Sequence, residues 1–151
     1  MKQTKLRTLI LAAMFAALTC VATMIIHIPS PIGGYFNLGD CMVLLSAFVL
    51  GPVWGTAAGG IGSALADIIS GYAVFAPGTF VIKALIAVIA AAILKALGSK
   101  TKAAPIVASI AGEAWMLLGY FLYESIFLGY GLAAAGSIGG NAIQAVAGVI
   151  L

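Results

Sequence analysis

The chain has 151 residues, of which 64% are hydrophobic and 7% are charged, with a formal net charge of +3. Its mean hydropathy is +1.21, whereas an average soluble domain is about half apolar and about a quarter charged. A soluble domain of this length cannot bury so much apolar surface. The composition excludes a soluble enzyme, a nucleic-acid-binding protein and a secreted disulfide scaffold, and it indicates an integral membrane protein.

Apolar runs alternate with short segments rich in glycine and proline along the whole sequence. A helix needs roughly 20 residues to cross a bilayer, and proline or glycine clusters end helices. We predict a single all-α domain over residues 1–151, an integral membrane six-helix bundle. Its predicted helices cover 5–28, 37–50, 53–70, 79–97, 104–127 and 132–151.

Basic residues predict the orientation of the bundle. Of the seven Lys and Arg residues, all but Lys83 either precede the first apolar run or flank the loop at about 98–103. Basic residues in short loops stay on the cytoplasmic side, and an even number of predicted helices separates these two groups. We therefore expect cytoplasmic N- and C-termini and a multi-pass protein of the bacterial cell membrane.

Charged and polar side chains gather toward the outer halves of the predicted helices. A charged residue costs about 2.5–3.5 kcal/mol at the centre of a membrane helix, so such residues are usually functional. On 104–127, residues 113, 117, 120 and 124 share one helix face. We expect an outward-facing pocket with aromatic walls. The candidate substrate-binding residues are Asn37, Asp40, Asp67, Tyr72, Lys83, Glu113, Tyr120, Asn141 and Gln144.

Several of these residues also have structural interpretations. Asp67 and Lys83 lie at similar depths and could form an ion pair, and Asp40 could cap a helix. Asn141 and Gln144 could form hydrogen bonds between helices, and Glu124 could be solvated among the lipid headgroups. Glu113 lies far from both ends of its helix, which favours binding of a ligand or a proton.

Motifs of enzyme chemistry are missing from the sequence. There is no G-x-x-x-x-G-K-[ST] loop, no H-E-x-x-H and no G-x-S-x-G, so we expect neither an enzyme nor a resident cofactor or metal. Two functions remain open at this level. One is a binding subunit of an importer, and the alternative is a proton-coupled small-solute carrier or channel that uses Glu113.

Small residues recur at helical spacing on two predicted helices. Residues 55, 59, 62 and 66 are glycine or alanine, and such a stripe lets helices approach closely, so we expect it to pack within the chain. Alanine also repeats at every fourth position in the first helix, which alone is only a weak indication of a partner surface.

Four motifs in order resemble a known family. GYFNLGD (34–40), LGPxxG (50–55), GSALADxxxGY (62–72) and APGTxxxK (76–83) are similar to segments of the substrate-binding S components of energy-coupling-factor (ECF) vitamin transporters. The resemblance is closest to the branch with riboflavin-type and hydroxymethylpyrimidine- or pyridoxine-type members. It covers about the first two-thirds of the chain.

The resemblance implies a subunit that captures a vitamin outside the membrane. It further implies a transmembrane coupling subunit and two cytoplasmic ATPase subunits as partners. The coupling subunit would contact Ala12, Ala13, Ala16 and Ala17. A lid over the pocket would comprise Pro31, Gly33, Gly34, Tyr35 and Phe36.

The charges in the membrane favour one kind of substrate. Four carboxylates face one lysine in the apolar runs, so a compound with hydrogen-bond donors or a positive charge should bind better than an anion. This favours a hydroxymethylpyrimidine, a thiamine-related compound or pyridoxine, with riboflavin also possible.

Overall fold

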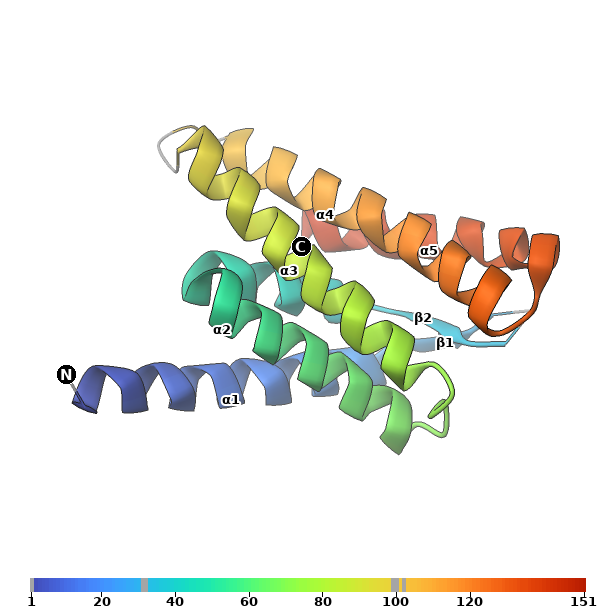
Figure 1. The fold of residues 1–151 in the computed structure, drawn as a ribbon, viewed down its shortest axis with the longest axis horizontal. Coiled ribbons are helices and arrows are strands. Elements are labelled where there is room, and N and C mark those ends of the chain that lie inside the picture. The colour runs from blue at the N-terminus through green and yellow to red at the C-terminus, as the bar shows by residue number, and fades with distance from the viewer. Residues whose placement is uncertain (1, 31–32, 99–100, 102) are drawn as a thin grey trace.

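A computed structural model describes residues 2–30, 33–98, 101 and 103–151. Within these residues, five helical segments are long and apolar enough to cross a membrane, so the chain is a helical, membrane-embedded protein. The helices are α1 (Lys2–Ile25), α2 (Gly39–Ile69), α3 (Ala76–Leu97), α4 (Ala103–Leu122) and α5 (Ile138–Ile150). Figure 1 shows α3 crossing the middle of the molecule between α2 and α4.

The predicted helices 37–50 and 53–70 form one element, α2, which is broken at Gly51. Gly51 has φ 76° and ψ −176°, outside the helical region, and Pro52 follows it. Beyond the break the chain doubles back, since a Cβ on Gly55 would lie 2.6 Å from the Cα of Ala47. Figure 1 shows this reversal. The count of six separate helices differs from the structure at this point.

The first helix ends three residues earlier than predicted, and a β-ribbon follows it. α1 ends at Ile25, and β1 (His27–Pro29) pairs with β2 (Tyr35–Asn37) in antiparallel register. Proline at 29 and positive φ angles at Gly33 and Gly34 suit a turn rather than a helix. The sequence predicted a helix to residue 28 followed by a loop, and it did not predict the strand pairing in this short segment.

The last two predicted helices change type near their connection. The predicted helix 104–127 is α-helical to Leu122 and continues as a π-helical turn, Tyr123–Phe127. The predicted helix 132–151 begins with a 3₁₀ segment, Gly131–Ser137, before α5. Each apolar segment still has about the predicted length. Such local changes of winding are common at helix ends.

The glycines of α2 provide close helix packing, as the sequence predicted. A Cβ at Gly62 would collide with the backbone oxygen of Ala16 in α1, and one at Gly59 would meet Val43 at 2.9 Å. Such contacts bring backbones together without hydrogen-bonding side chains. They bring α1 against α2 and the two arms of α2 against each other.

Candidate functional site

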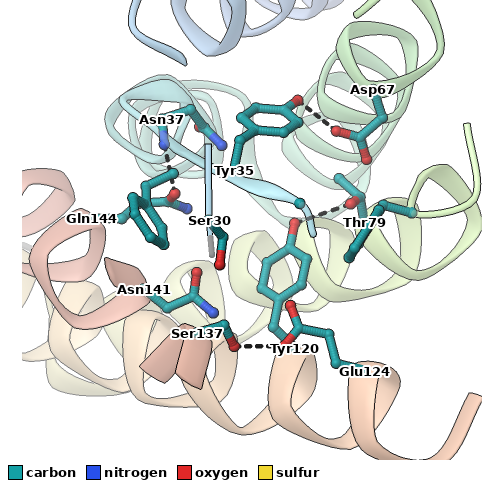
Figure 2. A pocket seen from close by; sticks show the side chains of 13 residues that line it. Ser30, Tyr35, Asn37, Asp67, Thr79, Tyr120, Glu124, Ser137, Asn141 and Gln144 are labelled. Atoms are coloured by element: carbon teal, nitrogen blue, oxygen red, sulfur yellow. Dashed lines mark hydrogen bonds between the residues drawn. The ribbon is translucent and has the colours of Figure 1, made fainter. Parts of the chain in front are cut away.

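A polar pocket lies against the β-ribbon (Figure 2). Figure 1 shows the ribbon at the end of the bundle opposite the start of α1. Its cavity volume is about 20 Å³, far below the roughly 300–1,000 Å³ of ordinary small-molecule sites, so the pocket is nearly closed in this structure. The lining residues come from the ribbon and from four helical segments. They are Ser30, Gly34, Tyr35, Phe36, Asn37, Asp67, Phe75, Thr79, Tyr120, Glu124, Ser137, Asn141 and Gln144.

The structure brings together part of the predicted site. The residues that line the pocket are Asn37, Asp67, Tyr120, Asn141 and Gln144, together with the predicted lid residues Gly34, Tyr35 and Phe36. The residues that do not line it are Asp40, Tyr72, Lys83, Glu113 and Gly33. Pro31 lies outside the described residues. The candidate site is therefore shallower than the sequence indicated.

Tyr35 fastens the ribbon over the pocket. Its hydroxyl donates a 2.5 Å hydrogen bond to Oδ1 of Asp67, as Figure 2 shows, and its ring stacks on His27 with centroids 3.8 Å apart. Burial and the neighbouring carboxylate of Asp67 raise the pKa of the Tyr35 hydroxyl. The hydroxyl therefore remains a donor at any physiological pH. Tyr72 lies against the same cluster, with its centroid 4.8 Å from that of Tyr35, and so supports the lid from outside the pocket.

Phe36 and Gly34 pack the ribbon against the helices. A Cβ on Gly140 in α5 would overlap the ring of Phe36, and one on Gly34 would lie 3.1 Å from the ring of Phe75. The glycines thus leave room for aromatic side chains to fit tightly at both sides of the pocket.

Lys83 pairs with Asp40, and not with Asp67 as the sequence allowed. Both partners of this ion pair are almost fully buried. Asp40 also does not act as a helix cap, because its two oxygens bind Lys83 and Gln144. The N–H of Gly39, the first residue of α2, instead donates to Oδ1 of Asn37. Its second oxygen, Oδ2, accepts a 2.7 Å hydrogen bond from Nε2 of Gln144. Both ion-pair residues lie behind the pocket wall.

Hydrogen bonds between helices arrange the rest of the wall. The hydroxyls of Thr79 and Tyr120 are 3.0 Å apart, and Ser137 donates a 2.5 Å hydrogen bond to Oε2 of Glu124 (Figure 2). Glu124 is only 3% exposed, so the alternative of a solvated headgroup residue was wrong.

Some polar atoms remain available to a ligand. Oδ2 of Asp67 and the hydroxyl of Ser30 are buried without a hydrogen-bond partner, and Asn141 points into the space in Figure 2. Buried polar atoms are normally paired, so these atoms mark places where a ligand's polar groups fit. Among the described lining residues two are carboxylates and none is lysine or arginine.

Comparison with known proteins decides the family. The family model for the ECF-type riboflavin transporter S component matches residues 3–151. The chain belongs to this family. As an S component it is a substrate-binding subunit of a transporter and not an enzyme.

A solved structure agrees with that assignment, and a second similar protein carries no functional description. A solved structure described as "Structure and mechanism of the S component of a bacterial ECF transporter" matches with a TM-score of 0.77 at 25% identity, covering 97% of this chain and 90% of that one. A Pyrococcus woesei protein described as "Uncharacterized protein in gap 3'region" is 39% identical over 132 residues, 87% of this chain and 86% of that protein.

The alanines of α1 in the S component divide into two faces. Ala12 is buried, and the backbone of Ala16 packs against Gly62 of α2, whereas Ala13 and Ala17 are exposed. All four border an apolar groove between α1 and α2, with a space of about 1010 Å³ that includes its open side.

The list of candidate substrate-binding residues omitted Ser30, Phe75, Thr79, Glu124 and Ser137, although the sequence places residue 124 on the polar face of its predicted helix. Three of these had a usable signal. Thr79 lies four residues before Lys83, and Glu124 lies four residues after Tyr120. Ser137 lies four residues before Asn141, so each of the three shares a helix face with a chosen residue. For Ser30 the sequence offers no such signal, because its position depends on the ribbon.

Proposed function

We propose that this S component captures an uncharged heterocyclic vitamin rich in hydrogen-bond donors, with riboflavin as the first candidate. The observation that carries this proposal is the composition of the pocket. Two carboxylates and three amides meet aromatic side chains there, and the described lining residues include no basic side chain. A flavin has a flat ring system that can lie against aromatic rings and a hydroxylated chain that can donate to carboxylates.

Riboflavin is placed ahead of hydroxymethylpyrimidine, thiamine-related compounds and pyridoxine because of the family match. The charges of the lining residues alone favour these smaller compounds as much as they favour riboflavin. In the small space observed, a tricyclic ligand would require outward movement of the β-ribbon. Such a movement is possible because, among the described residues, only a few hydrogen bonds hold the ribbon against the helices.

We further propose that the protein works in the cell membrane with a transmembrane coupling subunit and two cytoplasmic ATPase subunits. The S component itself has no P-loop, so the energy for transport must come from partners. The groove beside Ala13 and Ala17 is the proposed contact for the coupling subunit.

The proposed topology has six spans with cytoplasmic termini. It treats the two arms of α2, before and after Gly51, as separate membrane segments. In Figure 1 the start of α1 and the facing ends of α3 and α4 lie at one end of the molecule, and the ribbon lies at the other. Lys95, near the end of α3, supports a cytoplasmic position for the first of these ends.

Ligand titration of the purified S component tests this function. We expect riboflavin to bind with a dissociation constant below about 1 µM, or about −8 kcal/mol, measured by quenching of flavin fluorescence. Its phosphate ester should bind at least about tenfold more weakly, because a phosphate would face Asp67 and Glu124. Tight binding of hydroxymethylpyrimidine or pyridoxine without riboflavin binding would replace the substrate. No binding of any of these vitamins would contradict the proposal.

A further inference from the structure

The ion pair of Asp40 and Lys83 lies deep in the bundle, although neither residue lines the pocket. Asp40 is 0% and Lys83 is 1% exposed. Burial of such a pair brings little net stability, because desolvation opposes the attraction and apolar residues of similar volume are often as stable. Stability alone therefore does not explain why this pair is present.

The pair is connected to the pocket wall through Gln144. Nε2 of Gln144 donates to Oδ2 of Asp40 over 2.7 Å, and Lys83 donates to Oδ1 of the same carboxylate. On its other side, Oε1 of Gln144 accepts a 2.8 Å hydrogen bond from the backbone N–H of Asn37. Figure 2 shows this last contact at the wall of the pocket.

These contacts fix the orientation of the Gln144 amide. An ionised carboxylate accepts hydrogen bonds and cannot donate them, so the amide must turn its NH₂ group toward Asp40. Only this orientation turns its oxygen toward the N–H of Asn37. In the reversed orientation, two donors would face each other at Asn37, and the contact between β2 and α5 would be lost.

The contact with Lys83 suits the carboxylate form of Asp40, which this arrangement requires. Another ionisable group nearby is Glu113, whose carboxyl oxygens are buried without a hydrogen-bond partner. Oε1 of Glu113 and Cβ of Asp40 both lie within 3.1 Å of a Cβ placed on Gly148. The ammonium of Lys83 donates to Asp40, and an opposite charge in contact favours the ionised carboxylate.

We propose that Asp40 and Lys83 are positioning residues for substrate binding, which orient Gln144 and thereby hold the end of β2 against α5. This inference rests on the proposed function for its ligand, since the held strand is part of the lid. Asp40 would act on the lid from behind the pocket, without touching the substrate.

Exchange of the two functional groups tests the proposal. Asp40→Asn replaces one carboxylate oxygen with an NH₂ group, so residue 40 can no longer accept hydrogen bonds from both Lys83 and Gln144. Gln144→Glu places two carboxylates opposite each other. Each single variant should speed riboflavin dissociation at least about tenfold in stopped-flow measurements. In the double variant Asp40→Asn/Gln144→Glu, the amide at 40 donates to the carboxylate at 144, which still accepts from Asn37. Its dissociation rate should return to within about threefold of the wild-type rate.

A second variant separates positioning from folding. Asp40→Leu/Lys83→Met replaces both charges with apolar side chains, so the protein should keep its thermal stability while riboflavin dissociates at least about tenfold faster. Wild-type dissociation rates in this variant and in Asp40→Asn would overturn the proposal. So would a double exchange that is no better than its worse single variant.

Hydrogen–deuterium exchange provides a readout that needs no ligand. The backbone N–H of Asn37 should exchange faster in Asp40→Asn than in the wild type, and the exchange variant should restore its protection. If riboflavin fails to bind the wild-type protein, the substrate assignment fails while this measurement still decides the role of Asp40. Unchanged exchange at Asn37 would overturn the positioning role even if riboflavin binds.

Discussion

Tyr35 donates a 2.5 Å hydrogen bond to Asp67 and so joins the β-ribbon to the C-terminal end of α2. A second contact, from Asn37 to Gln144, joins the same strand to α5. The strand is therefore held at its first and last residues by different helices. Opening of the pocket requires at least one of these contacts to break.

Substitution of Tyr35 by Phe should weaken the first contact without removing the ring. The stacking on His27 can remain, but Asp67 loses its donor, a change worth about 1 kcal/mol. We expect bound riboflavin to dissociate about five- to tenfold faster in stopped-flow fluorescence. Tyr123→Phe is the matched control, because its hydroxyl donates to the carbonyl of Val74 outside the pocket. Equal effects of the two substitutions would show that Tyr35 has no special role in the lid.

Two adjacent glycines of α5 provide a steric test of the lid. A Cβ on Gly140 would overlap the ring of Phe36, whereas a Cβ on Gly139 would meet nothing within 4 Å. Gly140→Ala should displace Phe36 and weaken riboflavin binding at least about tenfold, or about 1.4 kcal/mol. Gly139→Ala should leave binding unchanged and stabilise the helix by about 0.5–1 kcal/mol. Calorimetric titration and thermal unfolding check both variants, and normal affinity in Gly140→Ala would contradict the packing of Phe36 on α5.

The two faces of α1 should respond differently to added bulk. Ala13→Trp and Ala17→Trp place a large side chain on the exposed face, so they should abolish ATP-dependent uptake and co-purification with the coupling subunit. Riboflavin binding by the isolated protein should change by less than about threefold, or about 0.7 kcal/mol. Ala12→Trp should instead overpack the contact with α2 and lower the melting temperature. Normal uptake by both exposed-face variants would remove this surface from the coupling-subunit contact.

Glu113 should affect stability more than substrate affinity. Its carboxyl group is 2% exposed, lacks a partner and lies outside the pocket lining. Glu113→Gln removes one potential buried charge and should raise thermal stability by about 1 kcal/mol or more, with affinity for riboflavin within about threefold of wild type. Glu124→Gln, within the pocket, should weaken binding. A tenfold loss of affinity in Glu113→Gln would return this residue to the substrate site.

The hydropathy of the apolar runs, together with the glycine and proline residues between them, placed most of the helical segments correctly. The predicted helix 79–97 corresponds to Ala76–Leu97, and the change near Leu50 coincides with the break at Gly51. These features follow from local sequence, because each helix must span an apolar layer. The β-ribbon could not be predicted in the same way, since its three-residue strands depend on pairing with each other and on packing against Asp67 and Phe75.

The partner of Lys83 shows where sequence reasoning reaches its limit. Helical periodicity indicates which residues share a face, but it does not indicate which neighbouring helix lies opposite. Both Asp40 and Asp67 were expected near the outer ends of their helices. Because α2 doubles back at Gly51, Asp40 lies beside α3 and Asp67 lies under the ribbon. The ion pair therefore depends on tertiary packing that the spacing of residues does not encode.

The hydrogen bonds that join Lys83, Asp40 and Gln144 behind the pocket also imply an order of assembly during synthesis. Asp40 precedes Lys83 by 43 residues and Gln144 by 104 residues. Because a chain is made from its N-terminus, the acid enters the membrane first, its cation follows with α3, and the amide arrives last with α5. A nascent chain released before α5 would hold the completed ion pair but only part of the pocket wall. Substrate could therefore stabilise this protein only after its final helix has been inserted.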